Sequence, residues 1–340
     1  MEQTAVEKKF GKYVMASMIT MFLQSAYSMI DGLFVSNLIG DTALSAVNVA
    51  WPVIAVVTAI GTGVGCGGAV MMSTKQGEGK NEESNIVRAN VILALLASSI
   101  VVTILFLILL TPLLKLMGAE GELLRLSQIY GRVMLTGGVL QILSCGLTPL
   151  LRNDNRAVSA MMIMVGGLFV NLGLDFVFMY VFHMGIGGAA GASLCAQLFT
   201  TLCCLIILGT KKTDPIRFSQ FKIRKECWKK IFKTAVSPFG ISLTPSLLIL
   251  YHNVACLKFG GDLAVNAYAL ISSTVGSYRV LLIGVAEGIQ PLASYAYGAH
   301  DFHAIRKIRN KAVITAMGVS FFLFIFTIAT ARFYPAIYGY

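Results

Sequence analysis

Two aspartates lie inside stretches that are otherwise apolar: Asp31 in MIDGLFV and Asp175 in NLGLDFVFMY. A carboxylate at the centre of a bilayer costs roughly 2.5–3.5 kcal/mol even on the lenient insertion scale, so such a residue is expected to face a cavity or a partner. A buried carboxyl group without a cationic partner can take up a proton or help to coordinate a sodium ion. Asp31 and Asp175 are therefore the first candidates for an ion-coupling site.

Amide side chains accompany both aspartates. Gln24 precedes Asp31 by seven residues and Asn171 precedes Asp175 by four, so on helices each amide shares a face with its acid. Each acid lies about 19 residues into a span that runs outward, which at a rise of about 1.5 Å per residue puts both at a similar depth. The spacing predicts one site for H⁺ or Na⁺ at Asp31, Asp175 and Asn171, with Gln24 beside it. The alternative is that each acid only hydrogen-bonds a neighbouring helix.

Two further side chains are candidates for a supporting role. Glu287 occurs in AEGIQP, and Arg279 lies two turns before it. The two charges could neutralise each other only through a third group or a bend of the helix, and Pro291 makes a bend plausible. A structural polar pair and a role in transport both remain open for Glu287. Tyr27 is the aromatic residue expected nearest the proposed site, although aromatic side chains on a span usually face lipid or other helices.

The elements that must hold these residues are membrane-spanning helices. The chain has 340 residues, of which 56% are hydrophobic and only 13% charged, about half the charged fraction of soluble domains. Its apolar runs are continuous, as in helices, and do not alternate, as barrel strands do. The fold class is therefore an all-α polytopic membrane protein. The expected spans are 12–37, 43–73, 89–114, 122–148, 156–182, 187–210, 232–259, 263–297 and 310–336.

The net charge of +11 is unevenly placed along the chain. Segments 1–12, 73–89, 149–156, 211–233 and 300–311 carry 21 of the 27 lysines and arginines. That placement follows the positive-inside rule, and it predicts a protein of the cell (plasma) membrane whose N-terminus lies in the cytoplasm. The basic charge thus indicates how the protein is oriented in membrane lipid, and it argues against binding of nucleic acid.

An internal repeat is expected at an offset of 221 residues. GDTALSAV at 40–47 aligns with GDLAVNAY at 261–268, and Gly63, Gly67, Gly77 and Arg88 align with Gly284, Gly288, Gly298 and Arg309. Six spans per copy return the chain to the same side, so the copies are parallel. The expected organisation is an N-lobe of six helices (1–210), a basic cytoplasmic linker (211–231) and a partial C-lobe of three helices (232–340).

This repeat has two consequences. A complete second copy would need roughly a hundred more residues, so a fragment of a twelve-helix protein is expected, with a genuine nine-helix protein as the alternative. His252 becomes the counterpart of Asp31 and could titrate in the other half, or could be a packing residue.

Enzyme motifs offer little. GTGVGCGG at 61–68 contains the letters of a dinucleotide fingerprint, but it lies inside a span, where close helix packing is expected. The sequence contains no Walker A, HExxH or Gly-x-Ser-x-Gly motif. The expectation is a protein that is not an enzyme and has no cofactor besides a coupling ion.

Several stretches together resemble the multidrug and toxic compound extrusion (MATE) family, in its bacterial drug-exporting branch. They are MIDGLFVSNLIGDTALSAV, KQGEGK, LRNDNRAVSAMM, NLGLDFVF followed by GIGGAAGASL, and EGIQPLASYAYGA, and the likeness runs from about residue 10 to 340. The resemblance implies two six-helix lobes around a cleft and export in exchange for H⁺ or Na⁺. It assigns the N-lobe site to Asp31, Asn171 and Asp175, and it matches Gln24 to a glutamine that precedes the acid in the family's first helix.

The chain also departs from that family. YVMAS at 13–17 lacks a proline found early in the first helix of many members, so a bending of that helix is in doubt. Helix seven has His252 where some members carry an acid. Polar residues that some members show in helix four reduce here to candidates such as Thr148.

The function predicted from sequence is a secondary antiporter, a monomer, that exports amphipathic, cationic drugs or toxins by alternating access. A lipid-linked oligosaccharide flippase of the same superfamily is the rival, but it would favour a cleft rich in arginine, and Arg279 is the only deep one identified. An intramembrane aspartyl protease is the rival of another class. It would need Gly-x-Gly-Asp, and Leu172–Asp175 reads LGLD. A regulatory or scaffold protein without transport is the last alternative.

Overall fold

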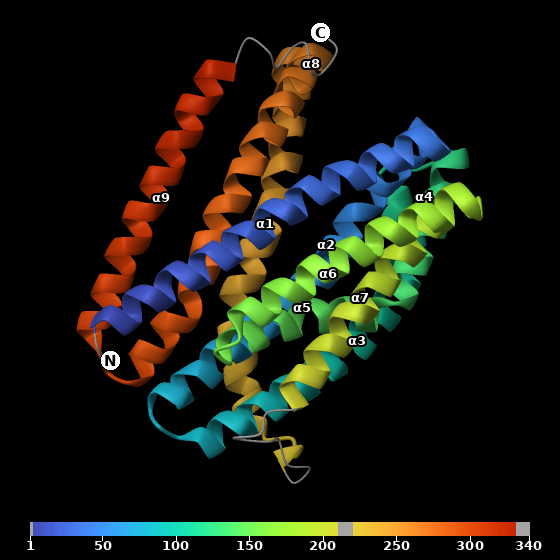
Figure 1. Cartoon of the computed structure of the whole chain (residues 1–340). Helices are drawn as coiled ribbons and strands as arrows, with labels where there is room; N and C mark the ends of the chain where they lie inside the picture. Colours follow the sequence, from blue (N-terminus) through green and yellow to red (C-terminus); the bar gives the residue numbers. More distant parts are fainter. Residues whose placement is uncertain (1–2, 210–219, 331–340) are drawn as a thin grey trace.

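The computed structural model describes residues 3–209 and 220–330, and the regular structure of this part of the chain is helical (Figure 1). The sequence forms helices here because its apolar runs are long and its prolines few. The elements are α1 (Gln3–Ile39), α2 (Asp41–Gly77), α3 (Asn81–Leu116), α4 (Gly121–Thr136), α5 (Gly138–Asn153), α6 (Ala157–Asp175), the π-helix η1 (Phe176–Val181), α7 (Gly185–Gly209), α8 (Lys225–Gly298) and α9 (Phe302–Thr330).

Six helices of the described residues are long and apolar enough to cross a membrane, and the broken pair α4–α5 makes a seventh if it is one span. The expected span 122–148 is this pair, bent by 58°. The break falls at Gly137, where a Cβ atom would lie 2.2 Å from a methyl group of Leu194 of α7, so a larger residue here would require Leu194 to move. The two spans expected at 232–259 and 263–297 lie in α8, which is not among the six, and they stay a prediction.

Helix α8 returns on itself. It is assigned as one helix of 74 residues, although we expected a break near 260–262. Gly67 of α2 packs against Ala235 near the start of α8, and Gly77 packs against Tyr295 near its end. Both ends of α8 thus lie against the same half of α2, and Figure 1 shows α8 as two adjacent legs. Of the linker expected at 211–231, residues 211–219 lie outside the described residues, and α8 already begins at Lys225.

The glycine-rich stretch of α2 is a packing surface, as predicted. A Cβ atom on Gly65 would lie 2.4 Å from the Cα atom of Gly146, and one on Gly61 would lie 2.7 Å from the carbonyl oxygen of Ile142. Real side chains do not approach this closely, so α2 and α5 touch backbone to backbone. This contact holds the core of the first six helices together.

Close contacts between α1, α2 and α8 repeat at the offset found in the sequence. Gly63 contacts Phe239 and Gly67 contacts Ala235; 221 residues later, Gly284 contacts Met18 and Gly288 contacts Val14. Met18 and Val14 are themselves the counterparts of Phe239 and Ala235 at that offset. Each contact therefore reappears with its two sides exchanged, as a pseudo-twofold axis between two repeats would produce.

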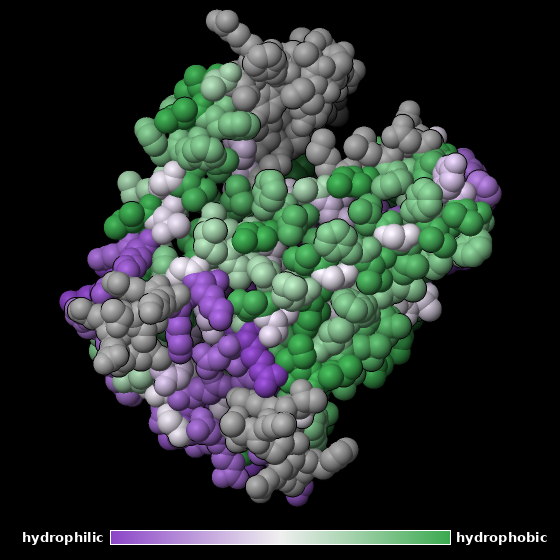
Figure 2. All heavy atoms as spheres, viewed as in Figure 1, coloured by the Kyte–Doolittle hydropathy of each residue, from purple (hydrophilic) through white to green (hydrophobic). Residues whose placement is uncertain are grey.

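Hydrophilic residues gather at one end of the molecule, and hydrophobic residues cover the helices beside it (Figure 2). That end carries the beginning of α1, the α2–α3 connection and the α8–α9 connection (Figure 1). Lys75, Glu78, Lys80 and Glu83 form ion pairs of 2.9 Å there. We call this the hydrophilic end; its three elements fall in three of the segments that the charge pattern placed in the cytoplasm.

Candidate ion-coupling site

Asp31 of α1 and Asp175 of α6 meet in the structure. Their carboxyl groups lie within hydrogen-bonding reach of one another. Asp175 is fully buried and Asp31 is partly buried. The matching depths counted along two helices thus correspond to one shared location.

Tyr27 and Asn171 complete a chain of hydrogen bonds around Asp175. The amide nitrogen of Asn171 donates to Asp175 Oδ2 at 3.0 Å. The hydroxyl of Tyr27, one turn before Asp31 on α1, has Asn171 Oδ1 as its near acceptor and Asp175 Oδ2 as a more distant one at 3.4 Å. Because a phenol carries one proton, Tyr27 can donate to only one of them at a time. Asn171 and Tyr27 therefore respond together to any change in the charge of Asp175.

Two residues that the sequence analysis did not single out border this group. Tyr130 of α4 is buried close to both carboxyl groups, and the hydroxyl of Ser193 of α7 lies within hydrogen-bonding reach of Tyr27. Tyr130 lies on the apolar face of an amphipathic helix, where a tyrosine is indistinguishable from a core residue. No spacing in the sequence connects either residue to Asp31.

The carboxyl pair retains capacity to bind an ion. The Oδ1 atoms of both Asp31 and Asp175 are buried and have no hydrogen-bond donor. Two carboxyl groups in contact need a proton or a cation between them, because two adjacent negative charges in a medium of low dielectric constant repel strongly. Carboxylate and amide oxygens are ligands that suit hard cations, so the oxygens of Asp31, Asp175 and Asn171 fit H⁺ and Na⁺ alike.

The backbone changes character directly after Asp175. Helix α6 ends at this residue, and the π-helix η1 follows from Phe176 to Val181. Single turns of π-helix occur frequently at functional sites because they reorient the side chains around them. The wider turn begins where the buried acid must face α1.

Other predicted residues lie elsewhere. Gln24 is exposed on α1 and makes no hydrogen bond to the carboxyl pair, whereas Tyr27 takes the position beside Asn171. His252 is exposed on α8, donates from Nδ1 to the carbonyl of Leu248 at 2.7 Å and stacks on Tyr268. The structure therefore does not bring Gln24 or His252 to the aspartates.

Glu287 has a partner that we did not predict. Arg152 of α5 donates to Glu287 Oε2 at 2.5 Å, and both side chains are largely buried. Arg279, the arginine that the sequence offers as a partner, is exposed instead. Thr148 lies one turn before Arg152, donates to the carbonyl of Ser144 and borders the same small gap as the ion pair. Glu287 and Arg152 thus form a second buried group, which we call the inner ion pair, and Thr148 borders it.

Arg152 was missed because its surroundings in the sequence, LRNDNR, read as a cytoplasmic loop. Helix α5 instead continues through Pro149 to Asn153, which carries Arg152 into the protein. Arg88, also assigned to a loop, is fully buried, with Nη1 3.5 Å from Asp154 Oδ2. Positive charge near a span end indicates the side of the membrane, but it does not distinguish a solvated arginine from a buried one.

Comparisons with known proteins identify the family and the fold that this chain resembles. The family model MatE matches residues 16–177 and 241–340. The chain is 25% identical over 322 residues to the multidrug export protein MepA of Staphylococcus aureus, covering 94% of this chain and 70% of that one. MepA of Staphylococcus saprophyticus is 24% identical over 298 residues, covering 87% and 66%.

Solved structures show the same fold. A transporter of the MOP superfamily from Pyrococcus furiosus matches 98% of this chain and 74% of its own, with a TM-score of 0.93 and 25% identity. A structure described as an outward-facing conformation of a multidrug resistance MATE family transporter matches with the same values. The all-helical membrane fold and the resemblance noted from sequence are thereby confirmed, and the chain belongs to the MatE family of membrane transporters.

Proposed function

We propose that this chain is the ion-coupled part of an exporter of amphipathic, cationic small molecules, driven by H⁺ or Na⁺. The observation that carries the proposal is the contact between Asp31 and Asp175, whose Oδ1 atoms are buried without a donor. Such a pair is stable only when an ion from solution reduces its charge. The proposal includes a monomer in the plasma membrane with its hydrophilic end in the cytoplasm, and it needs no organic cofactor.

Loading of the carboxyl pair would couple ion uptake to the positions of the helices. When H⁺ or Na⁺ binds, α1 and α6 can approach, because the repulsion between Asp31 and Asp175 is removed. When the ion leaves, the two charges favour separation of these helices and attract a cationic substrate. A ligand shifts such an equilibrium only by its difference in affinity for the two states, and the carboxyl pair supplies that difference.

The inner ion pair would close the path toward the hydrophilic end. Arg152 comes from α5 and Glu287 from the second leg of α8, so their contact joins elements of the two expected lobes. Along α1, the gap at this pair is bordered by Ser17 and Thr20, on the hydrophilic side of Tyr27. Opening toward the cytoplasm would require this pair to separate or to move as one body.

Dye efflux tests the proposal. In everted membrane vesicles that contain the protein, transport of a fluorescent cationic dye should follow an imposed H⁺ or Na⁺ gradient. Asp175→Asn should remove that dependence, whereas Glu122→Gln, at an exposed acid paired with Arg125, should not. Unchanged gradient-dependent efflux in Asp175→Asn would refute the assignment.

A pair of adjacent aspartates on two helices is also the arrangement of an intramembrane aspartyl protease. Cleavage of membrane-embedded peptides by the detergent-purified protein, lost in Asp31→Asn, would favour that rival. A flippase would require arginines that are available to a pyrophosphate. Arg152 and Arg88 are both engaged by carboxylates, which supports the drug exporter instead.

A further inference from the structure

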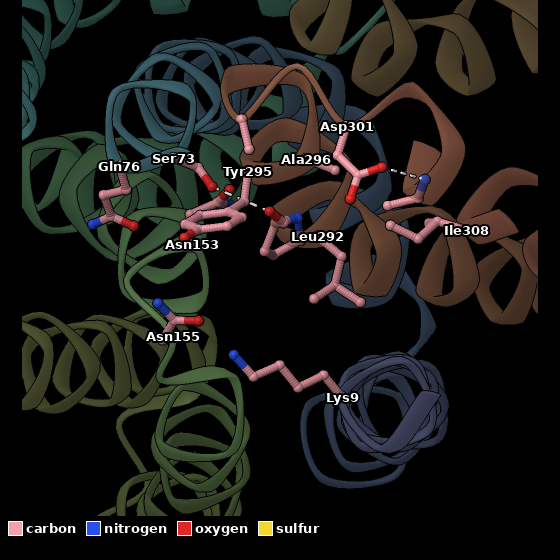
Figure 3. Close-up of a pocket in the computed structure, with 13 residues that line it drawn as sticks. Lys9, Ser73, Gln76, Asn153, Asn155, Leu292, Tyr295, Ala296, Asp301 and Ile308 are labelled. Atoms are coloured by element: carbon pink, nitrogen blue, oxygen red, sulfur yellow. Dashed lines mark hydrogen bonds between the residues drawn. The ribbon is translucent and has the colours of Figure 1, made fainter. Parts of the chain in front are cut away.

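A polar cavity of about 160 Å³ lies at the hydrophilic end, apart from the carboxyl pair. It lies among the ends of α1, α2, α5, α8 and α9 (Figure 3). Its volume is close to the roughly 150 Å³ of an engineered cavity that accepts benzene, so it can hold a small organic group. Gln76, Asn153 and Tyr295 line one side, and Lys9 and Asp301 contribute charges.

Two residues that line the cavity have amide oxygens that are buried and have no donor. Asn153 is 2% exposed, and its amide nitrogen donates to the carbonyl of Pro149 at 3.0 Å. The amide nitrogen of Gln76 donates to Asp154 Oδ1 at 3.2 Å. Both partners can only accept, so they fix which end of each amide is nitrogen. Asn153 Oδ1 and Gln76 Oε1 are therefore true acceptors, and both are without a partner.

Unsatisfied buried acceptors favour a ligand that brings N–H or O–H donors, because each one left unpaired costs about 1–3 kcal/mol. The charges around the cavity are Lys9, Asp301 and, behind Gln76, the Asp154–Arg88 pair. Asp301 Oδ1 accepts from the backbone of Ala304, so this carboxylate is held at the start of α9. Lys9 extends from α1 toward Asn155 across the cavity (Figure 3).

We propose that this cavity binds the ammonium or guanidinium group of a small organic cation, with Asn153 Oδ1 and Gln76 Oε1 as its acceptors. Asp301 stabilises the charge, and the ring of Tyr295 offers a face for a cation–π contact. The ammonium of Lys9 enters the same cavity and points toward Asn155 (Figure 3), so it competes with an organic cation for the space of the cavity and repels its charge.

The position of the cavity suggests its role. Along α1, Lys9 borders the cavity, Ser17 and Thr20 border the inner ion pair, and Asp31 lies in the carboxyl pair. Over these 22 residues a helix rises about 33 Å, close to the roughly 30 Å of the hydrocarbon layer. The cavity is thus the first binding site that a substrate meets on a path that ends at the carboxyl pair. This role rests on the proposed function, whereas binding in the cavity does not.

Saturation-transfer NMR on the purified full chain in detergent tests binding, with propylguanidinium as the probe. Tetramethylammonium is the matched ligand, because it has the same charge and no N–H donor. Propylguanidinium should bind saturably and at least about tenfold more tightly, since a hydrogen bond to a charged group contributes about 1.5–3 kcal/mol. Equal affinity for the two cations would overturn the proposal.

Three variants test the residues. Gln76→Met should weaken propylguanidinium binding about tenfold, and Asn153→Leu should do the same where it folds. Lys9→Gln should strengthen binding, because the competitor is removed. If Gln76→Met has no effect, or if Lys9→Gln weakens binding, the proposal is wrong. Asp175→Asn should leave binding in the cavity unchanged, so failure here and failure of the exporter function are distinguishable.

Discussion

Two groups of buried acidic side chains, the inner ion pair and the carboxyl pair, differ in how their charge is balanced. Glu287 of the inner ion pair faces Arg152 at 2.5 Å and is neutralised within the protein. Asp31 and Asp175 have around them two tyrosines, an amide and a serine hydroxyl, none of which carries positive charge. This difference indicates which acids can take part in ion coupling, because only an acid without a counter-charge inside the protein must take its cation from solution.

The largest expected effect is on the carboxyl pair as a unit. Asp31→Asn and Asp175→Asn should each reduce gradient-dependent dye efflux to the background, and the double variant should be no worse than either single one. Groups that act as one unit are strongly non-additive in this way. Efflux in vesicles measures it, and additive partial losses would show two independent acids.

The inner ion pair should respond through stability. Removing one partner of a buried pair leaves an uncompensated charge and costs about 3–5 kcal/mol, whereas replacing both by apolar residues is often neutral. Arg152→Met should therefore lower the melting temperature in detergent sharply, and Arg152→Met with Glu287→Leu should recover most of it.

The same pair of variants separates the two groups of acids. If the double variant Arg152→Met, Glu287→Leu remained as unstable as the single one, Glu287 would not be balanced by Arg152. The comparison would then fail, because Glu287 would also need a cation from solution.

A smaller effect is expected from Tyr27→Phe. It removes the hydroxyl that bonds Asn171, and a typical hydrogen bond contributes about 0.5–1.5 kcal/mol. The H⁺ or Na⁺ concentration for half-maximal efflux should shift by about two- to tenfold, with folding preserved. An unchanged half-maximal concentration would indicate that the tyrosine only packs against α6.

The smallest effect is expected outside the membrane, at the α2–α3 connection. Lys75 and Lys80 hold the pKa of the Glu78 carboxyl well below its ordinary value of 4.5, at about 2. Because the folded pKa is the lower one, the contribution to stability is present above pH 4.5 and is lost as the pH falls toward 2. Glu78→Gln should lower the melting temperature slightly at pH 7 in low salt. A drop of equal size in high salt would contradict a screened surface pair.

Sequence reasoning reached the carboxyl pair and missed the counter-charge of Glu287 for a physical reason. Depth along a helix follows from counting residues, so Asp31 and Asp175 could be placed at one level. Arg152 and Glu287 are 135 positions apart, and their contact depends on how α5 and α8 pack. That packing rests on backbone contacts of glycines, which identify a close approach without naming the neighbour.

The same limit explains the exchange of Gln24 for Tyr27. Both precede Asp31 at helical spacing, by seven and four residues, and periodicity favours neither. Which of the two side chains joins the site depends on the neighbouring helix. Asn171 accepts a hydrogen bond from the hydroxyl of Tyr27, whereas Gln24 is exposed. Spans were predicted within a few residues for α2 and α7, but the break at Gly137 required knowledge of Leu194.

The exchanged glycine contacts also bear on biosynthesis. Gly63 is covered by Phe239, a residue that the ribosome adds 176 positions later. Protein synthesis adds about 5–20 residues per second, so roughly ten to thirty-five seconds would pass between the synthesis of Gly63 and that of Phe239. During this interval its bare backbone surface is open to translocon components or lipid chains. A slow codon stretch between these positions would lengthen the exposure and lower the yield of the assembled transporter.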